Sequence, residues 1–214
     1  MAEMSTMTTA EEKGVDAAAR YRRSPGAHLA ETMAAGSGTA VRLRELPFQT
    51  MVALRVEPGT EAAGRVEAAL GLPLPASCGE VTGSTDGSGV AVLWQGPDEF
   101  LVVGPDEELP SPAELTAQLG EAIGAARGQA VDVSANRTTL ELAGTAARDV
   151  LEKAVVLDLH PRALPAGRAF ATLLGPVQVV LWKTRDEPEF RILPRGSFTE
   201  YTVALLLDSM AEFS

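Results

Sequence analysis

An internal repeat constrains this chain most, because two copies of one sequence pattern predict two copies of one structural unit. Each copy has an apolar run ending in tryptophan, a turn signal, a Glu-Phe pair and a Ser-x-x-Glu sequence. The matched segments are Val92-Leu93-Trp94 with Val180-Leu181-Trp182, Glu99-Phe100 with Glu189-Phe190, and Ser111-x-x-Glu114 with Ser197-x-x-Glu200. The spacing between the copies drifts by a few residues, as loop insertions and deletions produce.

Each copy is predicted to fold as strand-strand-helix-strand-strand-strand-helix. In the first copy, alternation of apolar and polar residues predicts strands at 41–46 and 50–56, and a helix follows between Thr60 and Gly71. A second helix over 112–126 begins with a capping box, in which Ser111 is the N-cap and Glu114 the third residue of the helix. The short turns between strands require largely antiparallel pairing.

The second copy repeats this order. Strands are expected at 130–134 and 138–142, a helix opens after Gly144-Thr145, and a helix over 198–211 closes the chain. We therefore expect an α+β fold made of two similar, mostly antiparallel sheet units with helices packed on the sheets. The expected organisation is an N-terminal arm at 1–38, a first unit at 39–128 and a second unit at 129–214.

The charge balance bears on the class of partner. The chain has 18 Lys and Arg against 29 Asp and Glu, a formal net charge of −11. Such a surface repels phosphate backbones and anionic lipid, so neither nucleic acid nor a membrane is expected as a partner. Cys78 is the only cysteine, which excludes an intramolecular disulfide, and the first residues are polar and acidic. A cytoplasmic location is therefore expected.

The arm carries a local basic patch on this acidic chain. Arg20, Arg22 and Arg23 cluster just before a Ser-Pro-Gly-Ala-His-Leu segment that contains His28 and Leu29. Arginine binds carboxylates through a bidentate fork and packs its flat face on aromatic groups. These five residues are predicted to contact a partner, ordering only in the complex, and a solvated tail is the alternative.

Few residues offer catalytic or metal-binding chemistry. The two histidines, His28 and His160, lie far apart in sequence, and Cys78 has no ligand partner or base near it in sequence. Asp132 and Asp158 could enter a cleft between the units, although Asp158 in a Leu-Asp-Leu sequence is more typical of a turn cap. We therefore predict no catalytic, cofactor-binding or metal-binding residue in this chain.

The order of several short motifs resembles a known family. These motifs are Arg23-Ser24-Pro25, Arg44-Glu45-Leu46, Trp94-x-Gly96-Pro97-Asp98-Glu99, Val131-Asp132-Val133-Ser134, Leu140-Glu141-Leu142-Ala143-Gly144, Asp158-Leu159-His160-Pro161 and Arg195-Gly196-Ser197-Phe198 with Tyr201. Together they resemble the gamma subunit of the heterotetrameric sarcosine oxidases. That family is in turn similar to the folate-binding aminomethyltransferase, the T-protein of glycine cleavage.

The resemblance implies a subunit of a complex that oxidatively demethylates sarcosine to glycine, with tetrahydrofolate as the one-carbon acceptor. It implies alpha, beta and delta subunits as partners. FAD, FMN, NAD, zinc and tetrahydrofolate would then be carried by those other subunits. The chain itself would have a structural role in assembly.

One departure from the aminomethyltransferase pattern supports a non-catalytic role. Aminomethyltransferases carry a catalytic aspartate after a glycine at the start of a hairpin strand, where this chain reads Gly175-Pro176-Val177-Gln178. Without that carboxylate, a folate cleft would lack the group that handles the proton. Two other classes stay open: a free-standing folate or one-carbon binding protein, and an enzyme whose site uses Asp132, Arg137 or Asp158.

Overall fold

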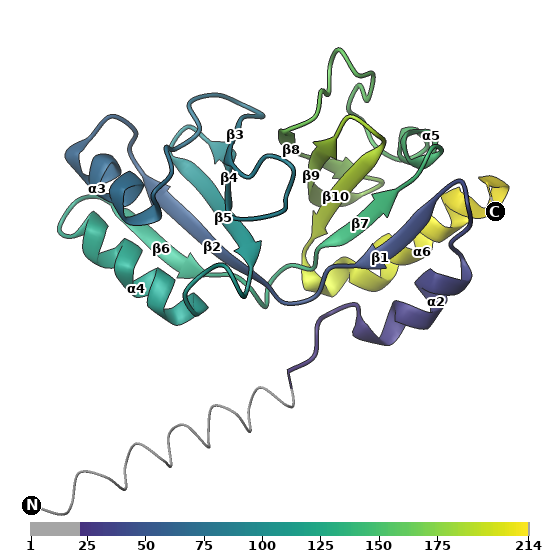
Figure 1. Ribbon diagram of the computed structural model, residues 1–214, viewed down its shortest axis with the longest axis horizontal. Coiled ribbons are helices and arrows are strands. Elements are labelled where there is room, and N and C mark those ends of the chain that lie inside the picture. Colours follow the sequence, from purple (N-terminus) through teal and green to yellow (C-terminus); the bar gives the residue numbers. More distant parts are fainter. Residues whose placement is uncertain (1–21, 214) are drawn as a thin grey trace, which may run out of the picture.

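The chain folds into two five-stranded antiparallel sheets that stand side by side with helices on their outer faces (Figure 1). The computed structural model describes residues 22–213. The first sheet has the strand order β3-β4-β5-β2-β6 and the second has the order β8-β9-β10-β7-β1. The predicted α+β class is confirmed.

The element order repeats as the sequence predicts. The first copy contains β1 (Arg42–Glu45), β2 (Gln49–Val56), α3 (Glu61–Leu70), β3 (Val81–Gly83), β4 (Ala91–Gly96), β5 (Glu99–Pro105) and α4 (Pro112–Ile123). The second contains β6 (Gly128–Asp132), β7 (Leu140–Ala143), α5 (Ala147–Glu152), β8 (Arg168–Leu174), β9 (Val177–Arg185), β10 (Glu189–Pro194) and α6 (Thr199–Met210). Short 3-10 turns flank these elements at η1 (Ala27–Leu29), η2 (Gly196–Phe198) and η3 (Ala211–Phe213), and α2 (Ala30–Ala35) follows η1.

The first strand of each copy, however, lies in the sheet of the other copy. Strand β1 pairs with β7, with Leu43 opposite Leu142, and β6 pairs with β2, with Val131 opposite Ala53. The boundaries 39–128 and 129–214 follow the sequence repeat, whereas the two sheets exchange these two strands. Residues 49–132 form one complete sheet, and they are inserted between the strands β1 and β7 of the other.

The helix termini confirm most of the predicted caps. Thr60 caps α3 by accepting a hydrogen bond from the backbone N–H of Ala63, and Gly71 ends the helix in the left-handed conformation. Ser111 and Glu114 form the predicted capping box of α4. The second box is absent: Ser197 lies inside η2, and α6 begins after Phe198 with no side-chain cap.

The two tryptophans occupy the same kind of element but opposite faces. Both lie on the first strand of a hairpin, as predicted, yet Trp94 packs towards the helices while Trp182 lies between the sheets. Phe100 is paired with Trp94, whereas Phe190 is paired with Lys183. Lys183 is therefore the residue that corresponds to Trp94 in the second sheet.

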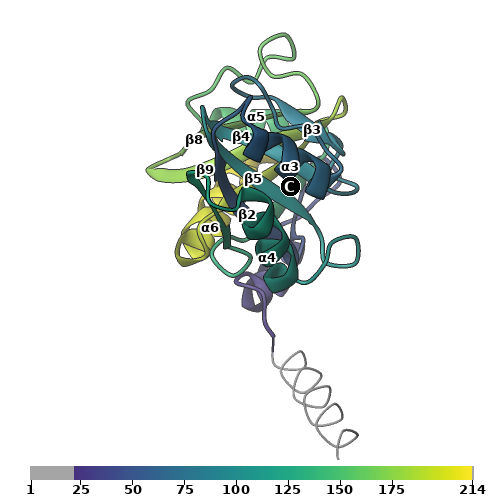
Figure 2. The same cartoon turned by 90° about the vertical axis from the view of Figure 1, so that its left-hand side faces the viewer.

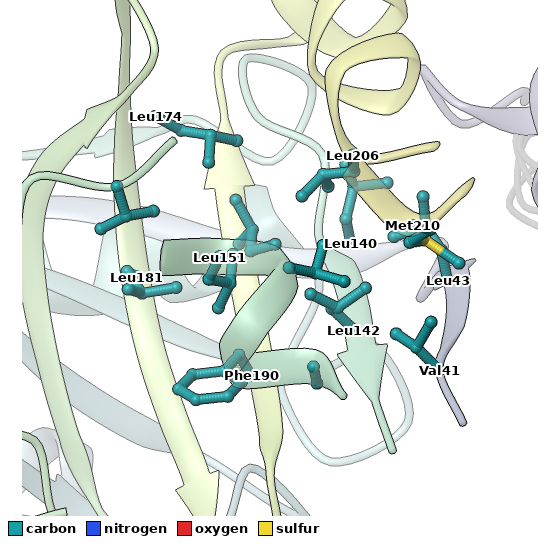
Figure 3. Close-up of a cluster of buried hydrophobic side chains, with 14 of the residues drawn as sticks. Val41, Leu43, Leu140, Leu142, Leu151, Leu174, Leu181, Phe190, Leu206 and Met210 are labelled. Atoms are coloured by element: carbon teal, nitrogen blue, oxygen red, sulfur yellow. The ribbon is translucent and has the colours of Figure 1, made fainter. Parts of the chain in front are cut away.

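Three hydrophobic clusters hold the layers together. One lies between α3, α4 and the first sheet, and Figure 2 shows these two helices in front of β2 and β5. A larger one lies under α5 and α6, where Leu142, Leu151 and Leu206 converge (Figure 3). The third fills the space between the sheets with side chains from both, including Met51, Leu93 and Trp182.

The described part of the arm packs on the body of the same chain. Glu45 accepts hydrogen bonds from the Ser24 hydroxyl at 2.6 Å, from the Gly26 N–H at 2.8 Å and from the Thr138 hydroxyl at 2.6 Å. Leu29 packs against the core of the second sheet. Leu29 is half-buried by this contact, and its burial against a partner stays a prediction.

Candidate functional site

The inter-sheet cluster covers only part of the first sheet, and a cleft opens where it ends. Ala53 on β2, Leu101 on β5 and Val131 on β6 line this cleft, which has a volume of ≈ 370 Å³. These side chains share the face of the sheet that carries Met51 in the inter-sheet cluster, because side chains on a strand alternate between faces. Val131 remains 38% exposed on the edge strand.

Two arginines line this first cleft. Arg137 lies on the connection between β6 and β7, Arg195 follows β10, and the two residues pair through an isolated antiparallel bridge. The Arg137 guanidinium donates a hydrogen bond to the carbonyl of Leu193 at 2.9 Å. Burial and the neighbouring charge of Arg195 lower the pKa of Arg137. Neither guanidinium forms an ion pair within residues 22–213.

The other charges of the first cleft are already paired. Arg55 binds Asp98 at 2.8 Å and Glu99 at 3.7 Å, so Glu99 is not the counter-ion of Arg137 or Arg195. The hydrogen bond and charge of Asp98, and then the charge of Glu99, raise the pKa of Arg55. The unpaired positive charge of the cleft therefore belongs to Arg137 and Arg195.

A second cleft, of ≈ 280 Å³, adjoins the first and shares Arg137 with it. The arm contributes Arg22 and Arg23 to its wall. Arg22 is held on the body, because it binds Asp106 at 2.5 Å and its guanidinium lies 4.8 Å from the centre of the Phe48 ring. Arg23 is exposed and forms no ion pair with any residue that the structure describes.

The structure gives the sequence-predicted carboxylates local roles. Asp132 accepts a hydrogen bond from the N–H of Ser134 at 2.9 Å, and Asp158 accepts one from the N–H of His160 at 2.9 Å. The turn-capping role expected for Asp158 is confirmed. Asp132 and Arg137 both line the second cleft, but Asp158 lines neither cleft. The three residues therefore do not form one site.

The remaining candidates are also dispersed. Cys78 is an exposed free thiol, and its carbonyl accepts a hydrogen bond from Arg168 at 2.8 Å. His28 contacts Glu200 at 2.8 Å on the surface. Arg20 lies outside the described residues. No group of three His, Cys, Asp or Glu side chains suited to a metal ion occurs between residues 22 and 213.

Sequence reasoning missed the pairing of Arg137 with Arg195. The sequence indicates Arg137 only as a candidate for an enzyme site, and Arg195 only as part of a motif shared with the family. The signal is weak in the sequence because the two residues are far apart in the chain and meet only where the pairing of β7 with β10 continues beyond the strands.

No helix within the described residues is long and apolar enough to cross a membrane.

Comparison with known proteins identifies the family. Residues 56–212 match the family model described as the sarcosine oxidase, gamma subunit family. The sarcosine oxidase subunit gamma of an Arthrobacter species is 48% identical over 194 residues, which cover 90% of this chain and 92% of that protein. The corresponding subunit of Corynebacterium sp. strain P-1 is 49% identical over 195 residues, with the same coverage.

Solved structures agree with the sequence comparison. A chain of the heterotetrameric sarcosine oxidase from Corynebacterium sp. U-96, in complex with pyrrole 2-carboxylate, superposes with a TM-score of 0.83 at 48% identity, covering 90% of this chain and 96% of that one. The aminomethyltransferase T of the glycine cleavage system from Bartonella henselae shares the fold, with a TM-score of 0.55 at 17% identity over 84% of this chain and 49% of that one. By its sequence and its structure, the chain belongs to the sarcosine oxidase gamma subunit family.

Proposed function

We propose that this chain is the gamma subunit of a heterotetrameric sarcosine oxidase, in which it has a structural role in assembly and contributes no catalytic residue. The observation that carries the proposal is the likeness along nearly the whole chain to a chain of the heterotetrameric enzyme, at 48% identity and a TM-score of 0.83. The partners would be the alpha, beta and delta subunits. The complex would act in the cytoplasm.

The local roles of the polar residues support a non-catalytic subunit. Asp132 and Asp158 are engaged in capping turns, and Arg137 holds a backbone carbonyl of β10. A general acid or base needs a carboxylate or imidazole free to exchange a proton with substrate. The candidates chosen from the sequence are thus used to fix the connections between strands.

The reaction proposed for the complex is the oxidative demethylation of sarcosine to glycine, with tetrahydrofolate as the one-carbon acceptor. FAD, FMN, NAD, zinc and tetrahydrofolate would be held by the other subunits. The space between the sheets fits a pterin poorly, because Trp182, Leu93 and Val180 fill it and are each 0–1% exposed. No step of the reaction is therefore assigned to this chain.

The arm is proposed as part of the surface that meets a partner. Arg22 and Arg23 line the second cleft, and Arg22 is held there by Asp106. His28 is exposed and contacts Glu200 of α6. Arginines held in place lose less conformational entropy on binding than mobile ones. Arg20 precedes these residues in the chain and extends the same basic segment.

Co-expression tests this proposal. The full chain is produced with the other subunits, one of which carries an affinity tag, and the purified material is assayed for stoichiometry, flavin absorbance and sarcosine oxidation. We expect this chain to co-purify in a one-to-one ratio, and omission of the chain to lower the yield of assembled enzyme. The chain purified alone should be colourless and inactive.

Two outcomes would contradict the proposal. Stoichiometric flavin in the isolated chain would assign a redox cofactor to this subunit. Saturable binding of tetrahydrofolate by the isolated chain, together with no association with the other subunits, would favour a free-standing folate-binding protein.

A further inference from the structure

Arg137 and Arg195 are two adjacent cations on an acidic chain. The chain has an excess of acidic residues, with a net charge of −11, and Arg22, Arg44, Arg55 and Arg185 each pair with a carboxylate. Arg137 and Arg195 lie beside each other with no carboxylate bound to either within residues 22–213. Two neighbouring cations repel each other, so the arrangement favours binding of an anion.

Backbone geometry places both guanidinium groups where an incoming anion could reach them. Residues directly opposite each other in an antiparallel bridge project their side chains to the same side. Arg137 and Arg195 form such a bridge, and both line the cleft. The hydrogen bond from Arg137 to the Leu193 carbonyl fixes one arginine, while Arg195 stays exposed.

The surroundings of the pair are suited to a segment of a protein. The floor of the cleft is apolar at Ala53, Leu101 and Val131, and Gln95 and Gln129 supply amide groups beside it. Apolar side chains next to arginine are typical of protein interfaces, whose cores are depleted in Lys, Asp and Glu. The cleft also borders β6, an edge strand with exposed residues, so an extended segment could lie along it.

We infer that Arg137 and Arg195 bind a carboxylate side chain, Asp or Glu, in a segment of a partner subunit that lies in the first cleft. Carboxylates match the planar guanidinium in a bidentate way, and two arginines can hold both oxygens of one carboxylate. This inference rests on the proposed function, because it names the surface through which the subunit assembles.

Three variants of the full chain, co-expressed with the tagged partner subunits, test the inference. Arg195→Gln removes one charge from an exposed residue whose side chain makes no hydrogen bond to residues 22–213, and Arg195→Glu reverses that charge. Arg137→Gln removes the other charge but also loses the bond to Leu193, so its folding is checked by thermal unfolding. Arg162→Gln is the matched control, since Arg162 is exposed, lines neither cleft and carries the same charge.

The measurement is the fraction of complexes that keep this subunit on dilution, determined by native mass spectrometry at several salt concentrations. We expect the dissociation constant to rise about tenfold for Arg195→Gln and roughly a hundredfold for Arg195→Glu. The control should match the wild type. Retention of the subunit by both Arg195 variants at the wild-type level would overturn the inference, and so would an equal loss in Arg162→Gln.

A second measurement identifies the bound group. Arg195→Lys keeps the positive charge and places an amine in the cleft, where a carbodiimide can join it to a touching carboxylate as an amide, with the elements of water passing to the carbodiimide. We expect a cross-link to an Asp or Glu of a partner subunit, read by peptide mass spectrometry. Cross-links only within this chain would overturn the inference.

The two levels of the proposal fail separately. If the wild-type chain does not co-purify with the other subunits, the proposed function itself is wrong. If the wild type assembles and the Arg195 variants assemble equally well, the subunit role stands and the carboxylate-binding cleft is rejected.

Discussion

Lys183 shows how a single residue can change role between two copies of one unit. It corresponds in the sheet to Trp94, and it is 1% exposed. Its ammonium group donates to the carbonyls of Arg185 at 2.9 Å and Asp186 at 3.3 Å, and it lies 5.2 Å from the centre of the Phe190 ring. A polar tip on a long apolar stem therefore replaces an indole and holds the turn that follows β9.

This correspondence could not be predicted from the sequence. The matched tryptophans suggested that the two VLW sequences coincide, but each hairpin contains an irregularity at a different place, between Trp94 and Gly96 in one and between Glu189 and Phe190 in the other. Because side chains alternate with a period of two, one extra residue moves a side chain to the other face. Sequence identity at Trp94 and Trp182 therefore predicts the strand but not the face.

The Lys183→Met variant should show the cost of the buried charge. Burial, and then the charge of Arg148, lower the pKa of Lys183. The pKa of Lys183 in the unfolded state is about 10.4, the usual value for lysine. At pH values between the lowered folded-state pKa and this value, the folded state binds fewer protons than the unfolded state. The free energy of unfolding of the wild type, relative to Lys183→Met, should therefore increase as pH rises through this window.

Urea unfolding at several pH values between neutrality and pH ~10 measures the difference. Lys153→Met is the control, because the Lys153 side chain is 36% exposed. If the wild type and Lys183→Met show parallel pH profiles, the folded state does not disfavour the charged form of Lys183.

At the scale of elements, the same Ser-x-x-Glu sequence forms a capping box at the start of α4 but not at the start of α6. Ser-x-x-Glu occurs before both closing helices, but only Ser111 accepts a hydrogen bond from the N–H of Glu114 while Glu114 binds back to Ser111. Pro112 at the first helical position supports that start. Before α6, a 3-10 turn occupies the corresponding residues, and Glu200 binds His28 of the arm.

Ser111→Ala and Ser197→Ala form a matched pair for this difference. Loss of an N-cap leaves backbone N–H groups of the helix unsatisfied and costs about 1 kcal/mol. We expect Ser111→Ala to lower the free energy of unfolding by about that amount, and Ser197→Ala to leave it within ~0.5 kcal/mol of the wild type. Chemical denaturation of the purified variants checks both values, and equal losses would show that Ser197 also stabilises a helix start.

The hydrogen bonds that stabilise the Glu114 carboxylate add a pH dependence. They come from the Ser111 hydroxyl first and from its backbone N–H second, and they lower the pKa of Glu114. Stability from a carboxylate with a lowered pKa is present above its unfolded-state pKa and is lost as pH falls through the folded-state value. The difference between wild type and Ser111→Ala should therefore shrink in acid.

At the scale of the whole molecule, the exchange of first strands makes the two copies interdependent. The sequence predicts the number, type and order of the strands well, because hydrophobic alternation and turn residues are local signals. It does not predict which sheet receives β1 or β6, because alternation indicates a buried face without naming the neighbouring strand. The pairings of Leu43 with Leu142 and of Val131 with Ala53 are contacts between distant parts of the chain.

The same exchange explains why the candidate cleft was not foreseen. The connection that crosses between the sheets follows β6 and carries Arg137, so it places Arg137 beside the first sheet. The Arg137–Arg195 bridge itself continues the pairing of β7 with β10, which both belong to the second copy, and the exchange of β6 brings this pair beside Ala53 and Val131. The position of the site therefore depends on the topology. The sequence identifies Arg137 and Arg195 individually, but it does not indicate that they lie together in one cleft.

The stabilities of two fragments test whether the folding unit follows the observed sheet or the sequence repeat. A fragment of residues 47–135 contains all five strands of the first sheet with both of its helices, including β6. A fragment of residues 39–128 follows the repeat instead, so it lacks the β6 ladder and carries β1 without β7. We expect the first fragment to unfold cooperatively in urea and the second to be less stable by roughly 2–5 kcal/mol, since the lost ladder contributes about 1 kcal/mol per hydrogen bond.

Separation also exposes the inter-sheet face of the first sheet. Met51, Leu93 and Leu101 are buried by the second sheet and would meet water in the isolated fragment. We therefore expect the 47–135 fragment to bind a hydrophobic dye and to associate as its concentration rises, so unfolding should be followed at low concentration. If the 39–128 fragment is as stable and cooperative as 47–135, the exchanged strand β6 contributes nothing to the sheet, and each sequence copy is an independent folding unit.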